Sequence, residues 1–593
     1  MLKLLKYLRK IDILLFVGMV VLIFCQVALD LMLPDYMSQI VNMLTSGEEI
    51  QMQSILLIGG KMLGFSLGSI VCSVLVGLLL NTIGSNLSKN LRSKFFEKVE
   101  SLSMNEMNQF SPSSLMTRTT NDVTQVKSLI TMGMRMLVTA PLMAIWALIK
   151  IIRSSGQLSF ATMVCIVLLV AAIGGIFAFA IPQFKKFQKL IDRTNLVSRE
   201  NLTGLRVIRA YNSQQFQEER FEEVNESLTK TNFTIGKIMS LLSPAINIIL
   251  SGLTLFIYWY GASLAQQNVM NIGQIMAFAQ YSMMILSSFS LIAMIFVMFP
   301  RASVSAKRLN EVLDTKCSIE FPQNTNGVFE GEGEVVFKNV SFKYPGAQDY
   351  VLKNISFEAK KGQTVAFIGS TGSGKSTLIN LVPRFYDATE GQITLDGVDI
   401  KDISKKDLID KIGYVPQKGM LFGGTIASNI RYGKEDATDE QIKKACSIAQ
   451  CSHFIGKFSD GIEHHIAQGG TNVSGGQRQR LSIARAIVKD PEIFIFDDSF
   501  SALDYKTDKK LRAAITKELS GKTNLIVAQR VGTIISADLI IVLENGEVVG
   551  KGTHEELLKN CEVYKEIAKS QLGEEVAQCA NITVKSQKIS KVA

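Results

Sequence analysis

The sequence predicts an α-helical membrane domain with six spans, followed by an α/β domain built around a phosphate-binding loop. The chain has 593 residues, of which 47% are hydrophobic, and a positive mean hydropathy, so it can hold a membrane domain and one ordinary α/β domain. Runs apolar enough to cross a bilayer all lie before Arg301. After about residue 332 the pattern changes to short β-rich strands, glycine turns and charged helices.

Six apolar runs make up the predicted membrane domain. Nothing from Ile238 to Pro300 carries an acidic or basic side chain, so this stretch predicts a helical hairpin that turns near residues 266–271. A cleaved signal peptide is the alternative for the first run, but that run is long and has no small-residue cleavage site. The runs centre near residues 13–33, 55–81, 129–152, 158–181, 238–262 and 273–299.

The distribution of lysine and arginine predicts the orientation in the membrane. Basic residues precede the first run in segment 3–10, whereas the loop 35–56 has none. They are dense again in 89–127 and 185–237 and absent from 263–272, so we expect a cytoplasmic N-terminus. Two residues in a predicted outer turn run against this pattern: Lys150 and Arg153.

The formal net charge of +10 does not indicate a nucleic-acid partner. The excess lies largely in cytosol-facing segments and at the C-terminus, where anionic lipid and membrane topology explain it more simply. Eight cysteines are scattered without a C-x-x-C pair. Neither a metal site nor a disulfide framework is expected from them.

The strongest motif is a glycine-rich loop between the apolar strand Thr364–Ile368 and a predicted helix. Its glycines let backbone N–H groups converge on a β-phosphate, Lys375 reaches the β and γ oxygens, and the Ser376 hydroxyl holds Mg²⁺. We therefore expect ATP and Mg²⁺ as ligands, with a chance glycine turn as the alternative. The loop residues are Gly369, Ser370, Thr371, Gly372, Ser373, Gly374, Lys375, Ser376 and Thr377.

A second glycine-rich cradle, Val473–Gln477, follows about a hundred residues later, and one chain cannot fold both onto one nucleotide. With this pair the chain resembles the ATP-binding cassette transporters over nearly its whole length, and more narrowly the half-size exporters of multidrug type. The resemblance implies that Tyr344 stacks on adenine, that Gln417 senses Mg²⁺ and the γ-phosphate, and that Asp497 orients Mg²⁺. It also implies residues that close over a partner's ATP and couple the two sites: Ser474, Gly475, Gly476, Gln477 and Asp504.

Two positions depart from the family pattern. Asp498 stands where the family usually has a catalytic Glu, and Gln529 where it has a switch His. Shortening Glu to Asp withdraws the carboxylate by on the order of 1 Å, and a misplacement of that size can cost about a hundredfold in rate. Gln529 donates a hydrogen bond but carries no titratable proton. We expect ATP to bind here and to be hydrolysed poorly; neutral drift with full activity is the alternative.

These departures predict a heterodimer with a second half-transporter that carries Glu and His. A homodimeric exporter, an ATP-gated channel or regulatory subunit, and an importer with the exporter fold are the alternatives. The exported substrate is not identified. The last span is rich in methionine and aromatic residues that suit an apolar cavity, or that face lipid and neighbouring helices: Met276, Phe278, Tyr281, Met283, Met284, Phe289, Met294 and Met298.

The predicted domains are a membrane domain at 1–310 with two cytoplasmic coupling loops, a linker at 311–332, a nucleotide-binding domain at 333–572 and a mobile tail at 573–593. We expect a multi-pass protein of a bacterial plasma membrane with a cytoplasmic nucleotide-binding domain. By resemblance, two segments look like the coupling loops: 111–123 and 200–211.

Overall fold

The computed structural model describes residues 2–45, 52–325 and 331–572. The predicted tail at 573–593 lies outside the described residues. The chain divides into two compact units, each described here by itself. The first comprises Met1–Glu100 and Ser111–Thr315, and the second comprises Ser101–Phe110 and Lys316–Ala593.

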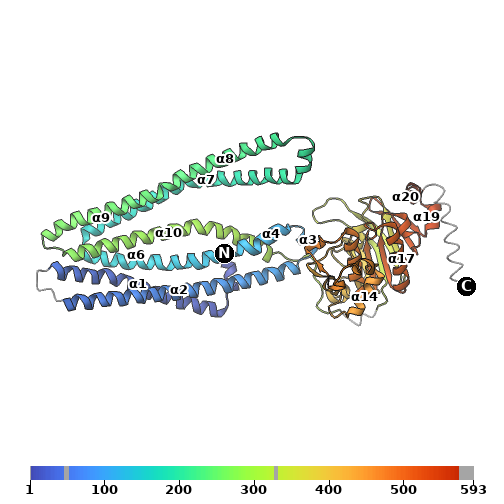
Figure 1. Ribbon diagram of the computed structural model, residues 1–593, viewed down its shortest axis with the longest axis horizontal. Coiled ribbons are helices and arrows are strands. Elements are labelled where there is room, and N and C mark those ends of the chain that lie inside the picture. Colours follow the sequence, from blue (N-terminus) through green and yellow to red (C-terminus); the bar gives the residue numbers. More distant parts are fainter. Residues whose placement is uncertain (1, 46–51, 326–330, 573–593) are drawn as a thin grey trace. The chain divides into compact units, whose positions relative to one another are not determined.

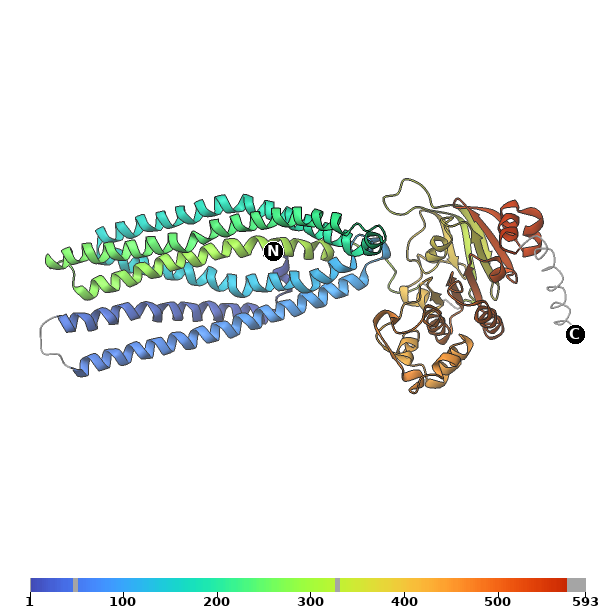
Figure 2. The same ribbon diagram turned by 45° about the horizontal axis from the view of Figure 1, so that its top comes forward.

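The described residues of the first unit form helices and no strands, and six of its helical stretches are long and apolar enough to cross a membrane, which confirms the predicted number of spans. The third stretch, Pro112–Ser154, contains two π-turns, Arg118–Asp122 and Leu129–Gly133. The predicted hairpin turns between Gln266 and Ile272. The long helices of this unit are α1 (Lys10–Thr45), α2 (Met52–Ser101), α6 (Met134–Ser154), α7 (Gly156–Ala210), α8 (Gln214–Ser240), α9 (Leu242–Gln266) and α10 (Ile272–Leu313), as Figures 1 and 2 show.

Each long helix buries one stripe and leaves the rest of its apolar surface exposed. On α1, side chains four residues apart are buried: Met19, Ile23, Val27 and Leu31. Residues on other faces of α1, such as Val17 and Val21, are more than half exposed, as side chains that face lipid should be. Helix α10 packs against α1, α6 and α9, and α7 packs against α8 and α9.

A polar network joins three of these helices. Lys150 of α6 forms an ion pair with Asp35 of α1, with 2.6 Å between Nζ and Oδ2. The hydroxyl of Tyr281 on α10 donates to the other carboxylate oxygen at 2.6 Å and to the carbonyl of Leu31 at 3.0 Å. Lys150, which runs against the basic-residue pattern, therefore has an acidic partner within the helical unit.

The second unit contains a six-stranded sheet in the order β12-β11-β3-β10-β9-β6, in which only the edge strand β12 is antiparallel to its neighbour. A four-stranded antiparallel sheet, β2-β1-β4-β5, and a short ribbon, β7-β8, complete it. The strands are β1 (Val335–Phe342), β2 (Leu352–Ala359), β3 (Thr364–Gly369), β4 (Glu390–Leu395), β5 (Val398–Asp399), β6 (Ile412–Val415), β7 (Gly424–Thr425), β8 (His465–Ile466), β9 (Ile493–Asp497), β10 (Thr523–Val527), β11 (Leu539–Glu544) and β12 (Glu547–Gly552).

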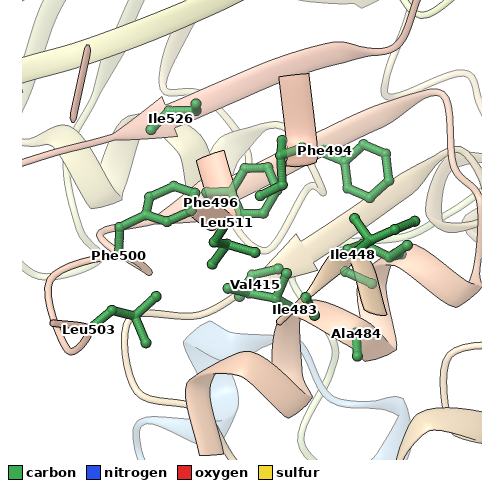
Figure 3. Packing of buried hydrophobic residues seen from close by; sticks show 14 of the residues in the cluster. Val415, Ile448, Ile483, Ala484, Phe494, Phe496, Phe500, Leu503, Leu511 and Ile526 are labelled. Carbon is green, nitrogen blue, oxygen red and sulfur yellow. The ribbon is translucent and has the colours of Figure 1, made fainter. Parts of the chain in front are cut away.

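Helices and the smaller sheet cover both faces of this sheet, so its central strands are apolar on both sides. On β9, Phe494 and Phe496 enter one core cluster, and Ile493 and Ile495 enter the other. Figure 3 shows the first cluster, where the two phenylalanines share a layer with residues of the helices. The helices of this unit are α3 (Met104–Met107), α11 (Lys375–Leu381), α12 (Lys405–Asp410), α13 (Ile426–Arg431), α14 (Asp439–Ile448), α15 (Ser452–Ile455), α16 (Gly475–Val488), α17 (Tyr505–Glu518), α18 (Val531–Ile534), α19 (His554–Asn560) and α20 (Glu562–Leu572). This architecture, a helical membrane domain followed by an α/β domain, is the predicted fold class.

Candidate active site

The phosphate loop lies between the carboxyl end of β3 and the start of α11. Gly372 and Gly374 adopt φ values of +86° and +93°, a conformation that favours glycine. A Cβ on Gly374 would lie 2.7 Å from Leu352 Cδ2 and 3.0 Å from the carbonyl of Val351, whereas a Cβ on Gly372 would meet nothing within 4 Å. The loop is thus closely backed on one side and open on the other, as a backbone cradle for phosphate requires.

Lys375 is held inside this loop. Its Nζ donates to the carbonyls of Gly369 and Ser370 at 3.0 and 2.6 Å and to Ser373 Oγ at 3.2 Å. Burial lowers the pKa of the Lys375 ammonium, and the charges of Asp498 and Asp497 oppose that shift. The ammonium therefore lies among phosphate-loop oxygens and near two carboxylates.

The groups present fit a magnesium nucleotide. Ser376 Oγ donates to Asp497 Oδ1 at 2.7 Å, which brings together a hydroxyl and a carboxylate, the oxygen donors that Mg²⁺ prefers. Burial raises the pKa of Asp497, as does the charge of Asp498, while the Ser376 hydrogen bond and Lys375 lower it. A cation bound there would relieve the cost of burying this carboxylate.

The two residues that depart from the family pattern contact each other. Asp498 follows β9 with φ +45°, and its backbone N–H donates to the carbonyl of Val527 at 3.1 Å. Its Oδ2 accepts Gln529 Nε2 at 2.8 Å and Gln417 Nε2 at 3.3 Å. The fold therefore brings Gln417, Asp498 and Gln529 together from the ends of three parallel strands, β6, β9 and β10.

Tyr344 lies beside the loop. Its hydroxyl is 3.0 Å from Thr377 Oγ1, and its ring meets Tyr386 edge-on with the centroids 5.3 Å apart. The hydroxyl of Tyr386 accepts Asn108 Nδ2 at 3.0 Å. Neither Tyr386 nor Asn108 was singled out from the sequence, because a lone tyrosine and a lone asparagine carry no spacing that would mark them.

The second glycine motif caps α16. Ser474 Oγ accepts the N–H of Gln477 at 3.3 Å, and the Gln477 side chain accepts the N–H of Ser474 at 2.9 Å. Ser474 and Gly475 are exposed, and a Cβ on Gly475 would meet nothing within 4 Å. Among the described residues no hydrogen bond joins this motif to the phosphate loop, and the N–H groups of Ser474 and Gln477 are paired within the motif.

Asp504 is likewise a helix cap, at the start of α17. It accepts the N–H of Thr507 at 3.0 Å, and hydrogen bonds from Thr507 lower its pKa.

A buried residue that the sequence analysis did not identify links α16, the helix that begins at the second glycine motif, to the segment around Gln417. Gln479 accepts from the N–H of Gly419 at 2.8 Å and donates to the carbonyl of Pro416 at 2.9 Å.

Comparisons with known proteins agree with this geometry. The protein-family description "ABC transporter transmembrane region" matches residues 15–289, and "ABC transporter" matches residues 352–501. The uncharacterized ABC transporter ATP-binding protein Rv1273c of Mycobacterium tuberculosis is 37% identical over 87% of this chain and 89% of its own length. YfiB of Bacillus subtilis, also described as an uncharacterized ABC transporter ATP-binding protein, is 34% identical over 94% and 96%.

A third relative, also from Bacillus subtilis, is named the probable multidrug resistance ABC transporter ATP-binding/permease protein YheI and is 34% identical over 82% of this chain and 83% of its own length. The solved structure described as a bacterial Atm1-family ABC exporter with ATP bound superposes on this chain with a TM-score of 0.80 at 23% identity. The match covers 93% of this chain and 98% of the exporter chain, which supports the fold. The chain therefore belongs to the ATP-binding cassette (ABC) transporter family, as a multi-pass membrane protein with the exporter fold and an ATPase domain coupled to transport.

Proposed function

We propose that this chain is one half of a heterodimeric, ATP-driven exporter. Its own phosphate loop retains ATP and hydrolyses it slowly. Its signature motif, Ser474–Gln477, completes the faster site on a partner half-transporter that carries the usual Glu and His.

The observation that carries this proposal is the hydrogen bonding of Asp498. Its Oδ2 accepts amide donors from Gln529 at 2.8 Å and Gln417 at 3.3 Å. A general base needs a free lone pair within about 3 Å of the water that it activates. The lone pairs of Oδ2 are directed at the two amides, which leaves only Oδ1 to accept from a water, and the side chain is one methylene shorter than Glu.

Gln529 also lacks the chemical properties that the family's switch His would supply to hydrolysis. Its amide nitrogen is engaged with Asp498, and an amide supplies neither a titratable proton nor a positive charge to a γ-phosphate in the transition state. The two substitutions therefore weaken the same step, the attack of water on ATP.

Binding of ATP should be intact, because the groups for it are present. Lys375 and the loop N–H groups would bind the phosphates, Tyr344 would stack on adenine, and Ser376, Asp497 and Gln417 would hold Mg²⁺. When bound, Mg²⁺ would supply charge neutralisation on the phosphate oxygens.

ABC exporters act as dimers in which each ATP lies between the phosphate loop of one chain and the signature of the other. A homodimer of this chain would carry Asp498 and Gln529 in both sites, whereas a heterodimer confines them to one. The exposed N-terminus of α16 is available to a partner.

We place the N-terminus and the nucleotide-binding domain in the cytoplasm of a bacterium, because the basic residues follow that orientation. Segments 111–123 and 200–211 are proposed as coupling loops. Multidrug export is supported by the resemblance to a relative named a probable multidrug resistance transporter.

The test compares substitutions in the assembled transporter. Ser474→Ala or Gly476→Ala should reduce ATP turnover by about a hundredfold, since both alter groups that face the partner's ATP. A Cβ on Gly476 meets its nearest neighbours at 3.4 Å, so the chain should fold normally. Asp498→Ala, the matched change in this chain's own site, should reduce turnover less than about threefold.

Equal losses in the two kinds of variant would contradict the division of labour between the sites. Full turnover by purified homodimers of this chain would instead identify Asp498 and Gln529 as sufficient, and would favour the homodimeric exporter.

A further inference from the structure

A cavity of about 400 Å³ lies between three membrane helices, α1, α9 and α10. Its size falls in the range of about 300 to 1,000 Å³ that is usual for small-molecule sites. Asp30 of α1 is the one carboxylic acid among the described residues that line it. The lining residues are Asp30, Leu33, Pro34, Thr254, Tyr258, Ala279, Gln280, Met283 and Met284.

Asp30 has one hydrogen-bond partner and no cationic one among the described residues. Ser69 Oγ of α2 donates to its Oδ1 at 2.5 Å, and no ion pair joins Asp30 to a lysine or arginine. Asp35, five residues further along α1, differs because Lys150 neutralises it. Arg135 donates to Ser73, one turn beyond Ser69 on α2, rather than to Asp30.

An ionised carboxylate within a membrane span is costly unless a partner charge compensates it, and such residues mark substrate or ion paths. One hydroxyl supplies a single hydrogen bond and orients the carboxylate, but it leaves the negative charge uncompensated. The missing partner of Asp30 is a positive charge that the described part of the chain does not provide.

The rest of the wall fits an apolar body attached to that charge. Met283 and Met284 offer flexible, polarisable thioethers that adapt to different shapes. Tyr258 offers an aromatic ring of the kind that attracts cations. Phe278 and Tyr281 of the same helix are buried among neighbouring helices and do not line the cavity.

We propose that this cavity binds amphipathic organic cations, with Asp30 as the counter-charge and Ser69 as the residue that positions its carboxylate. This inference rests on the proposed export function, for which it names a substrate class. The ammonium of a small molecule and that of a lipid headgroup share the chemistry that Asp30 recognises.

The test is equilibrium binding of tetraphenylphosphonium, without ATP, to the full-length transporter in nanodiscs of phosphatidylglycerol. Asp30→Asn keeps the shape and the Ser69 contact but removes the charge, and it should weaken binding about tenfold or more. Asp30→Glu keeps the charge and should stay within about threefold. Glu97→Gln, which makes the same carboxylate-to-amide change at an exposed residue of α2 that pairs with Lys94 and does not line the cavity, is the matched control and should bind like the unchanged protein.

Neutral triphenylphosphine oxide should bind equally to the unchanged protein and to Asp30→Asn. The proposal is overturned if Asp30→Asn binds tetraphenylphosphonium normally, or if it loses the neutral compound to the same degree. Asp30-dependent displacement of the probe by added phosphatidylethanolamine would assign the site to a lipid ammonium, and lack of displacement would assign it to a free cation. Retained binding of the neutral compound shows that the membrane domain of each variant is folded, and because the assay needs no hydrolysis, its result does not depend on which nucleotide site is active.

Discussion

Restoring the two family residues in this chain's own site is the sharpest test of why that site is slow. The double change Asp498→Glu with Gln529→His replaces both members of the 2.8 Å contact between Nε2 and Oδ2. It lengthens the carboxylate by one methylene towards the nucleotide and supplies a proton-bearing ring. Because both groups act on one step, their effects should not be additive.

The size of the gain follows from the geometry. Correcting a misplacement of about 1 Å is worth about a hundredfold in rate, or about 2.7 kcal/mol of barrier. Each single change should give less than about tenfold, because either the water or the γ-phosphate remains badly held. Residue 498 has φ +45°, where Asp is tolerated better than Glu, so a destabilisation of about 1 kcal/mol should accompany the longer side chain.

The assay is single-turnover hydrolysis of ATP by the assembled transporter whose partner lacks its own catalytic Glu, so that only this site is measured. Thermal unfolding and ATP retention control for the expected loss of stability. If the double variant binds ATP, remains folded and gains no rate, then Asp498 and Gln529 are not the cause of slow hydrolysis, and the signature contributed by the partner becomes the explanation.

Three further outcomes are expected. Tyr386→Ala removes the ring that meets Tyr344 edge-on, so it should weaken ATP binding about threefold to tenfold in a nucleotide titration, whereas Tyr386→Phe should change it less than about twofold. Gln479→Leu leaves two backbone groups unpaired and should lower the free energy of opening of segment 412–419 by about 2 kcal/mol, measured by amide hydrogen exchange. Burial lowers the pKa of His554, so the native state prefers the neutral ring; its stabilising effect is complete above about pH 6.5 and declines as the pH falls towards the folded-state pKa. The free energy of opening of α19, obtained from exchange rates corrected for the intrinsic rate at each pH, should therefore fall below about pH 6.5, and His554→Gln should remove that dependence; the same acid sensitivity in the variant would rule His554 out.

Much of the fold could be predicted from the sequence, because it depends on local patterns. Membrane spans follow from long apolar runs, and the apolar strand before Gly369 predicts the start of the phosphate loop. The contact of Gln417 with Asp498 could not be predicted by pattern alone, since it joins positions 81 residues apart and depends on the order of strands in the sheet. The sequence did not predict the buried contacts of Gln479, because a glutamine near the start of a polar helix is expected to face solvent. Asp30 is visible as a charge in an apolar run, but only the packing of α1, α9 and α10 shows what it faces.

The network around Asp35 has a mechanical consequence. One carboxylate engages Lys150 and Tyr281 through different oxygens, so neither α6 nor α10 can slide past α1 without breaking a polar contact. Near this carboxylate the three helices should consequently travel as one rigid body. Bending then has to be absorbed where the backbone is already irregular, at the π-turns Arg118–Asp122 and Leu129–Gly133 in the stretch that leads into α6. During transport, α1, α6 and α10 would thus move together near Asp35, and the third span would bend at its π-turns.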